Sequence, residues 1–178
     1  MKHKRLGFTI VELVVVIVII GILASLSVVA YGKVVRDTQQ SQRETDIEQL
    51  VKAITIARKS SGKTLGAITG SYWSTGTCTS TANNPDGTEP RDLPKTHVCW
   101  TRYYTNLDKI GAASGVDLKS LRSGDPRGNP YVWDENEGEG GDYCRTDGSI
   151  SYFTGSGIAT ATTSVSAIPK YISDCSLL

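Results

Sequence analysis

The sequence of 178 residues predicts an α+β fold in which one long N-terminal helix is packed on a small antiparallel β-sheet head. The first observation behind this prediction is an apolar run over residues 8–31 that continues into an amphipathic stretch over 32–60, with no proline and no glycine after Gly32. The second is a change of composition over residues 61–178, which are rich in Gly, Ser and Thr and contain short strand-like runs between turns.

The first 31 residues have the layout of a membrane segment. Residues 1–7, "MKHKRLG", are basic, and residues 8–31, "FTIVELVVVIVIIGILASLSVVAY", carry one charge, on Glu12. As a helix, the apolar run would be about 36 Å long, which is enough to cross a hydrocarbon core of about 30 Å with some tilt. The basic flank would then stay cytoplasmic, and the rest of the chain would face outward.

Three interpretations of this N-terminus compete. One is a plain membrane anchor. Another is a conventional secretory signal peptide, cut after the small residues at 28–30, although its apolar region would be long and would contain Glu12. The third takes the basic leader that ends in Gly7, the following Phe8, and Glu12 five residues after the glycine as one signal.

This third pattern resembles the class III signal of type IV prepilins and of the pseudopilins of type II secretion. The resemblance implies that a prepilin peptidase cuts between Gly7 and Phe8, and that the same enzyme N-methylates Phe8. It implies that the apolar helix stays in the mature protein, in the membrane or in a fibre core. It also implies a pilin-like fold, with the helix over 8–31 continuing through its amphipathic half over 32–60 onto the head.

The amphipathic half supports this interpretation. Apolar residues recur at helical spacing and form one face, at Ile47, Leu50, Val51, Ile54 and Ala57. Residues 36–46 are nearly all polar, so we expect them to be exposed. One helix is therefore predicted from about Phe8 to about Ser60, ended by Ser61 and Gly62. The alternative is two helices with a break near Gly32.

In the head, residues 106–121 are expected to hold a short helix broken by Gly111 and Gly115. Residues 143–153 are typical of a hairpin, and residues 158–168 of a further strand. These strands would form a small antiparallel sheet laid on the apolar face of the helix.

A second resemblance lies in the run "DPRGNPYVW" at residues 125–133. It is similar to the Asp-Pro-x-Gly-x-Pro-Tyr turn that opens the sheet in many pseudopilins and some minor pilins. Arg127 stands where that family has tryptophan.

Cys78, Cys99, Cys144 and Cys175 allow three disulfide pairings. A bond between Cys78 and Cys99 would close the long loop after the helix. A bond between Cys144 and Cys175 would tie a strand to the C-terminal tail, which resembles the disulfide-bounded C-terminal region of many type IV pilins. Reduced thiols are the alternative, and an extracellular location favours disulfides.

Motifs that would carry other chemistry are weak. No enzyme is expected, because His97 is the single histidine outside the leader and "SSGKT" at 60–64 lacks the remainder of a phosphate loop. Asp134 and Asp142 could offer oxygen ligands to calcium where major pseudopilins bind it, but the run fails the EF-hand spacing and a solvated turn is favoured.

Outside its basic tip the chain is nearly neutral, so no nucleic-acid partner is predicted. Core packing is expected for Tyr72, Trp73, Trp100, Tyr103 and Tyr104.

The sequence therefore predicts a structural subunit of a type IV pilus-like filament, used for adhesion or twitching motility. The precursor would sit in the cytoplasmic membrane, and the assembled filament at the cell surface. The resemblance implies as partners a prepilin peptidase, an assembly platform with its ATPase, other minor pilins and further copies of the chain. We expect Glu12 to pair with the Phe8 amine of a neighbouring copy.

Two other functions stay open. One is a minor pilin or pseudopilin of a secretion or DNA-uptake system, in which the fibre is short. The other is a membrane-anchored binding domain that never assembles.

Overall fold

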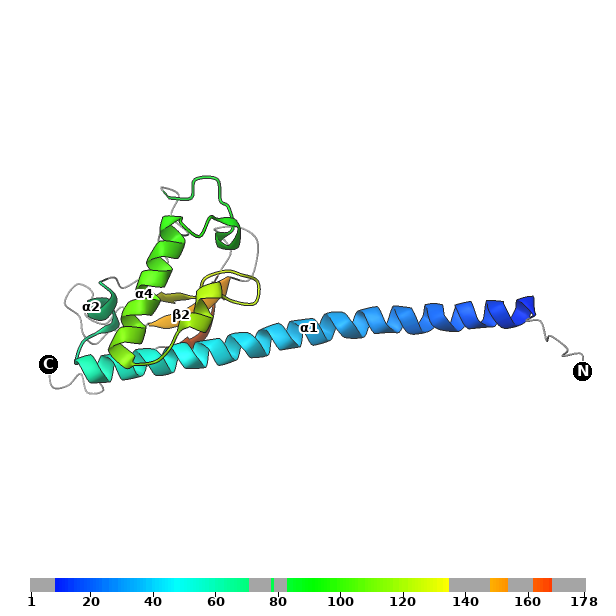
Figure 1. Ribbon diagram of the computed structural model, residues 1–178, viewed down its shortest axis with the longest axis horizontal. Coiled ribbons are helices and arrows are strands. Elements are labelled where there is room, and N and C mark those ends of the chain that lie inside the picture. Colours follow the sequence, from blue (N-terminus) through cyan, green and yellow to red (C-terminus); the bar gives the residue numbers. More distant parts are fainter. Residues whose placement is uncertain (1–8, 71–77, 79–82, 135–147, 154–161, 168–178) are drawn as a thin grey trace, which may run out of the picture. The chain divides into compact units, whose positions relative to one another are not determined.

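The structure is a computed structural model that describes residues 9–70, 78, 83–134, 148–153 and 162–167. The helices and strands are α1 (Ile10–Ser61), α2 (Leu65–Thr69), η1 (Pro90–Asp92), α4 (Val98–Ser114), η2 (Lys119–Ser123), β1 (Val132–Asp134), β2 (Ser149–Phe153) and β3 (Thr162–Ala167) (Figure 1). The fold is α+β with a pilin-like layout, as predicted. The chain divides into an N-terminal unit that ends at Ser41 and a second unit from Gln42, called here the head unit.

The helix α1 is continuous over 52 residues, so the alternative with a break near Gly32 is wrong. It ends where predicted. Gly62 adopts a left-handed φ of 66°, and its N–H donates to the carbonyl oxygen of Arg58 at 2.9 Å. Glycine reaches this conformation without a steric penalty, and the bond satisfies one of the last carbonyls of the helix.

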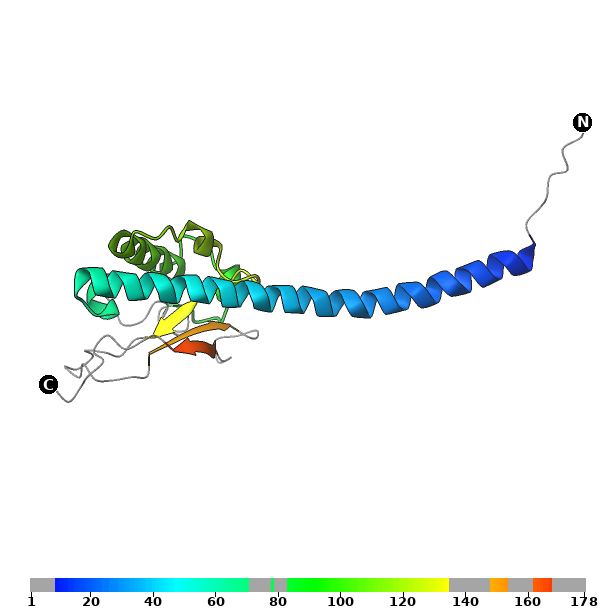
Figure 2. The same cartoon turned by 90° about the horizontal axis from the view of Figure 1, so that it is seen from below.

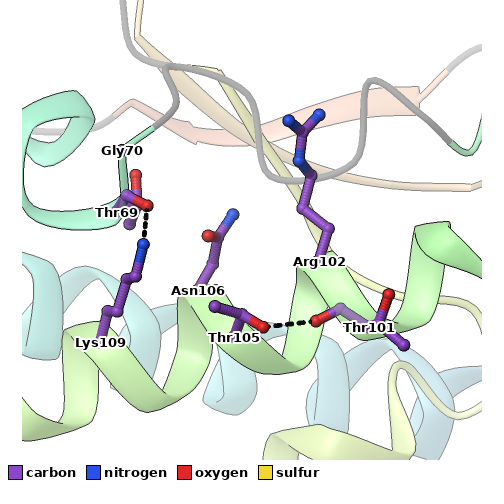
Figure 3. A pocket seen from close by; sticks show the side chains of 7 residues that line it. All are labelled: Thr69, Gly70, Thr101, Arg102, Thr105, Asn106 and Lys109. Carbon is purple, nitrogen blue, oxygen red and sulfur yellow. Dashed lines mark hydrogen bonds between the residues drawn. The ribbon is translucent and has the colours of Figure 1, made fainter.

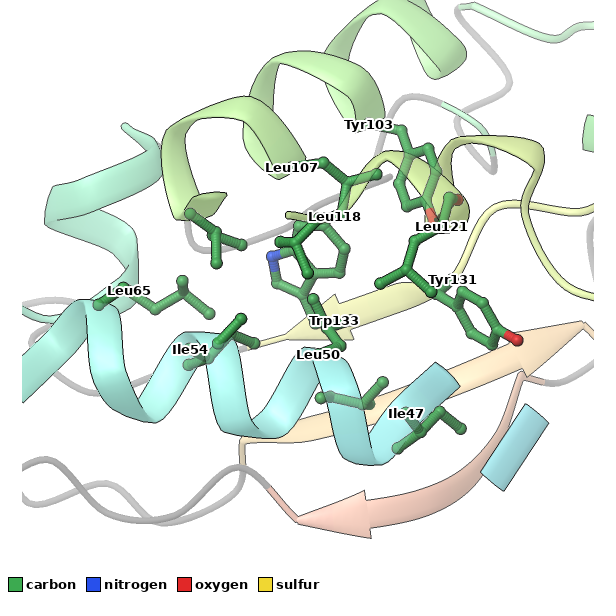
Figure 4. Close-up of a cluster of buried hydrophobic side chains, with 14 of the residues drawn as sticks. Ile47, Leu50, Ile54, Leu65, Tyr103, Leu107, Leu118, Leu121, Tyr131 and Trp133 are labelled. Carbon is green, nitrogen blue, oxygen red and sulfur yellow. Dashed lines mark hydrogen bonds between the residues drawn. The ribbon is translucent and has the colours of Figure 1, made fainter. Parts of the chain in front are cut away.

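The second half of α1 forms one wall of the core of the head unit. It lies along the junction between α4 and the sheet (Figure 1 and Figure 2). Figure 4 shows its apolar side chains meeting those of α4, η2 and β1. The fully or almost fully buried members include Ile47, Leu50, Ile54, Trp100, Tyr103, Leu107, Ile110, Leu121, Trp133 and Ile150. Each large side chain of this kind contributes about 1.5–3 kcal/mol when it leaves water, so this cluster is the main source of stability.

The sheet has the strand order β1-β2-β3, and both neighbouring pairs are antiparallel. Trp133 of β1 faces Ile150 of β2, and both side chains are buried in the core. The strand β3 confirms the strand predicted at 158–168. The second arm of the predicted hairpin is a strand, β2, but its two edges are paired with β1 and β3. The predicted first arm at 143–145 lies outside the described residues.

The helix α4 differs from the prediction for residues 106–121. It begins earlier, at Val98, where the Nδ1 of His97 accepts the N–H of Cys99 at 3.2 Å and caps the first turn. Gly111 does not break it, because a helical glycine costs only about 1 kcal/mol and buried aromatic and aliphatic side chains offset that cost. Gly115 ends the helix, with a φ of 72° and an N–H that donates to the Gly111 carbonyl at 2.8 Å.

A disulfide joins Cys78 to Cys99, with 4.7 Å between the two Cα atoms. It is one of the three predicted pairings, and it attaches the segment before η1 to the first turn of α4. Beside it, the ammonium of Lys95 lies 3.0 Å from the centre of the Trp100 ring, and the Trp100 Nε1 donates to the Pro90 carbonyl at 2.7 Å. The other two cysteines, Cys144 and Cys175, lie outside the described residues.

The expectation that residues 36–46 are exposed is wrong at two positions. Arg43 is 6% exposed and Asp46 is 8% exposed. The Nε of Arg43 donates to Asp125 Oδ2 at 3.1 Å, and its guanidinium lies 4.5 Å from the centre of the Tyr152 ring. These two polar residues are buried because the head supplies a partner for each.

The partner of Asp46 is Tyr131, directly before β1. The Tyr131 hydroxyl donates to Asp46 Oδ2 at 2.6 Å, and Gln42 Nε2 donates to Asp46 Oδ1 at 2.7 Å. We call the set of Arg43, Asp46, Asp125 and Tyr131 the helix–turn lock. It joins α1 to the "DPRGNPY" segment through two charged groups on adjacent turns of the helix.

The same Asp125 also shapes the turn itself. Its Oδ1 accepts the N–H groups of Arg127 and Asn129, both at 2.9 Å, and its own N–H donates to the Asn129 carbonyl at 2.7 Å. Gly124 precedes it with a φ of 82°, and a Cβ there would collide with the carbonyl oxygen of Asn129. The turn therefore requires glycine at this position and an acceptor at the next.

Arg43→Met should lower the free energy of unfolding by about 3–5 kcal/mol, because it leaves the Asp125 carboxylate buried without its cation. Chemical denaturation of the full chain in detergent micelles, followed by tryptophan fluorescence, measures this. Arg36→Met is the matched control, since Arg36 is exposed on the same helix. Equal stability of the two variants would contradict the role given to the lock.

Stability should also fall as the pH rises above about 10. Burial, and secondly the hydrogen bond to Asp46, raise the pKa of Tyr131 well above the ordinary tyrosine value of about 10. The folded phenol then stays protonated while the unfolded one ionises, so its contribution is complete below pH 10 and is lost above it. The slope attributable to one tyrosine is about 1.4 kcal/mol per pH unit.

Tyr131→Phe tests this, because it should reduce the slope of unfolding free energy against pH between about pH 10 and about pH 11.5, whatever it does to stability at neutral pH. Tyr103 is buried and its pKa is also raised, so a smaller slope should persist in the variant. A variant with the slope of the unmodified chain would refute the assignment.

The double variant Cys78→Ala/Cys99→Ala should be less stable by about 3 kcal/mol, the loop-entropy value for a closure of 21 residues. The measurement is again denaturant unfolding of the full chain, compared with and without a reductant. A double variant as stable as the unmodified chain would mean that this bond contributes nothing to stability.

Candidate functional site

The candidate site is the start of α1 and the apolar half that follows. The leader at residues 1–7 and Phe8 lie outside the described residues, so the predicted cleavage and methylation positions are not described. The first described residue is Thr9, which directly precedes α1.

Thr9 and Glu12 cap the helix reciprocally. The N–H of Glu12 donates to Thr9 Oγ1 at 3.2 Å, and both the N–H and the hydroxyl of Thr9 donate to Glu12 Oε2 at 2.8 Å. This is a capping box, which satisfies two backbone donors that the first turn leaves without partners. The carboxylate also lies at the positive end of the helix dipole, where a negative charge is stabilised.

Only one oxygen of Glu12 is engaged in this cap. Its Oε1 makes no hydrogen bond within the part of the chain that the structure describes, and both Thr9 and Glu12 are exposed. The carboxylate can therefore hold its own helix terminus and accept a second, external donor simultaneously. The prediction from the sequence named only the external partner, although the Thr-x-x-Glu spacing at residues 9–12 is the signature of the cap.

The apolar half of α1 has no covering within the N-terminal unit. Between residues 10 and 34 its large apolar side chains, as far as the structure describes them, are exposed by 46% to 83%. The hydroxyls of Ser25 and Ser27 donate to the carbonyls of Ile22 and Leu23 at 2.7 and 2.8 Å, so these polar groups are satisfied inside the helix. By length and composition this segment can cross a membrane, and lipid or apolar helices of other chains suit such a surface.

The remaining candidate residues are described only in part. Asp134 ends β1, whereas Asp142 lies outside the described residues. Within the described ranges, no group of three or more His, Cys, Asp or Glu side chains is placed to hold a metal ion. Trp100 and Tyr103 are core residues, as predicted, and Tyr104 is half-buried. Tyr72 and Trp73 are not among the described residues.

Comparison with protein families identifies the type of signal at the N-terminus. The family model described as the prokaryotic N-terminal methylation motif matches residues 2–28. The chain carries a class III prepilin signal. The match covers the leader, the predicted cut between Gly7 and Phe8, the capping box and most of the apolar run. Comparisons with curated proteins and with solved structures gave no match.

The prepilin signal is shared by type IV pilins and pseudopilins, and it implies processing by a prepilin peptidase. Together with the exposed apolar helix, it indicates a membrane-anchored precursor. The long helix and small antiparallel sheet of this pilin-like chain agree with that signal.

Proposed function

We propose that the chain is a structural subunit of a type IV pilus-like extracellular filament that serves adhesion or motility. In this proposal the precursor is cut between Gly7 and Phe8, N-methylated on Phe8 and assembled through the apolar half of α1. The observation that carries the proposal is that this half is exposed along its length and belongs to a prepilin signal. No catalytic role is proposed.

The energetics of assembly explain why Glu12 would matter. Moving the apolar helix from lipid into a fibre core gains little from the hydrophobic effect, because both surroundings are apolar. An assembly platform and its ATPase would supply work, and specific polar contacts would set the register. In the fibre core a lone carboxylate is costly, and the Phe8 amine of a neighbouring copy, created by the cut, is a suitable partner for the open Oε1 of Glu12.

A minor pilin or pseudopilin of a secretion or DNA-uptake system is the second candidate. It is favoured by the "DPRGNPY" segment, whose sequence resembles the turn of many pseudopilins and whose Asp125 belongs to the helix–turn lock. A membrane-anchored binding domain that never assembles is the third.

Electron microscopy of filaments sheared from cells, combined with mass spectrometry of the N-terminus, tests the proposal. Filaments in which this chain is the main component, beginning with methylated Phe8, are the expected result. A minor pilin or pseudopilin would be processed in the same way but would be scarce or absent in long filaments. An uncut precursor retained in the membrane would overturn the proposal in favour of the non-assembling domain.

Glu12→Gln should leave cleavage and membrane insertion intact and reduce filament yield at least about tenfold. Glutamine keeps the acceptor that caps Thr9 but removes the charge that would pair with a neighbouring amine. Immunoblots of sheared and membrane fractions measure both effects.

Thr9→Val is the control, because it removes the cap at a cost of about 1 kcal/mol at the helix terminus and keeps the charge of Glu12. We expect it to assemble nearly as well as the unmodified chain. Normal filament yield from Glu12→Gln would show that the charge is not needed for assembly.

A further inference from the structure

A polar pocket of about 300 Å³ lies in the head unit between the C-terminal end of α2 and one face of α4. Its lining comes from Thr69 and Gly70 and from five residues of α4, namely Thr101, Arg102, Thr105, Asn106 and Lys109. The spacing of the α4 residues places them on one continuous face of the helix, as Figure 3 shows. None of the roles assigned above uses this pocket.

The pocket is positively charged. Arg102 is half-buried and makes no hydrogen bond or ion pair with any residue that the structure describes. Lys109 uses one N–H of its ammonium to bind the carbonyl of Thr69, which closes the end of α2, and this leaves two donors. The described lining contains no carboxylate. Two cations without an acidic counterpart around a recess favour an anionic ligand.

The hydroxyl groups of the pocket are oriented as acceptors. Thr101 Oγ1 donates to the Val98 carbonyl at 3.2 Å, and Thr105 Oγ1 donates to the Thr101 carbonyl at 2.8 Å (Figure 3). Since each hydroxyl has one proton and that proton is committed, each offers only lone pairs outward. Such a lining suits a ligand that brings hydroxyl protons of its own.

An unsatisfied amide lies between the two cations. Asn106 is 3% exposed, and its Nδ2 has no hydrogen-bond partner among the described residues. Figure 3 shows this amide projecting between Lys109 and Arg102. A buried donor without a partner is costly, so a ligand that brings an acceptor to this amide would be stabilised in the pocket.

We propose that this pocket binds an acidic sugar, a uronate, through its carboxylate and its ring hydroxyls. The planar fork of the Arg102 guanidinium matches a carboxylate, and the Lys109 ammonium adds a second charge-assisted donor. The hydroxyl oxygens of Thr101 and Thr105 accept hydrogen bonds from ring hydroxyls, and the Asn106 amide donates one to an oxygen of the sugar. Inorganic phosphate offers charge but few O–H donors at neutral pH. It would therefore pair with the two cations but would not satisfy the acceptor oxygens of Thr101 and Thr105.

This inference goes beyond the filament proposal and does not depend on it, because the whole pocket lies within one head unit. Binding is measured on the full chain, purified in a detergent without a sugar headgroup, by isothermal titration calorimetry and saturation-transfer NMR. The probes are glucuronate, glucose and inorganic phosphate. For a ligand of this size in an open pocket, a Kd of about 1 mM is expected for glucuronate, with glucose and phosphate at least about tenfold weaker.

Arg102→Gln should weaken glucuronate binding about tenfold or more, because it removes the charge-assisted hydrogen bond while keeping an uncharged polar side chain at this position. The matched control is Lys52→Gln, which makes the same change of net charge at an exposed position of α1 and should bind as the unmodified chain does. Unchanged circular dichroism for both variants separates loss of binding from loss of fold.

Three results would overturn the proposal. One is the absence of glucuronate binding at about ten times the expected Kd. Another is equal weakening in Arg102→Gln and Lys52→Gln, which would indicate attraction to the overall charge. The third is phosphate binding as tight as that of glucuronate, which would indicate a general anion site. None of these results bears on whether the chain assembles into filaments.

Discussion

The carboxylate of Asp125 is the group on which the head unit depends. One of its oxygens pairs with Arg43 on α1, and the other holds the backbone of the turn that leads into β1. Its side chain is completely buried, so the charge is tolerable only while both sets of donors are in place. The position of α1 and the shape of the turn therefore depend on each other, because each supplies hydrogen-bond partners for the buried polar groups of the other. The strand β1 follows this turn.

Much of the fold was predictable because it follows from periodicity. The apolar face at Ile47, Leu50 and Ile54 and the end of α1 at Gly62 are local signals, and both are correct. The burial of Arg43 and Asp46 could not be predicted in this way. Their partners lie 82 and 85 residues further along the chain. Without those partners, a polar stretch of helix is predicted to be exposed to solvent. The early start of α4 was missed because histidine is a rare helix cap.

The candidate site shows the same division. Gly7, Phe8 and Glu12 were predicted from residue identity and spacing, and all three lie within the matched residues 2–28. The contact of Glu12 with Thr9 was not predicted, although the Thr-x-x-Glu spacing is a local signal for it, because the charge of Glu12 was assigned only to an intermolecular partner. The polar pocket on α4 was beyond prediction, since its charges matter only once Thr69 of α2 is brought beside that helix.

The arrangement of contacts along α1 has a mechanical consequence. The bonds between this helix and the rest of the head unit begin at Arg43 and Asp46, continue through the apolar face, and end where the Ser60 hydroxyl donates to the Ala113 carbonyl at 2.6 Å. They are spread over about 25 Å of helix axis. A force pulling along α1 loads them in parallel, so they must yield together. A force that peels the helix away sideways breaks them one after another, which requires far less tension. The head is thus built to resist traction along its own helix.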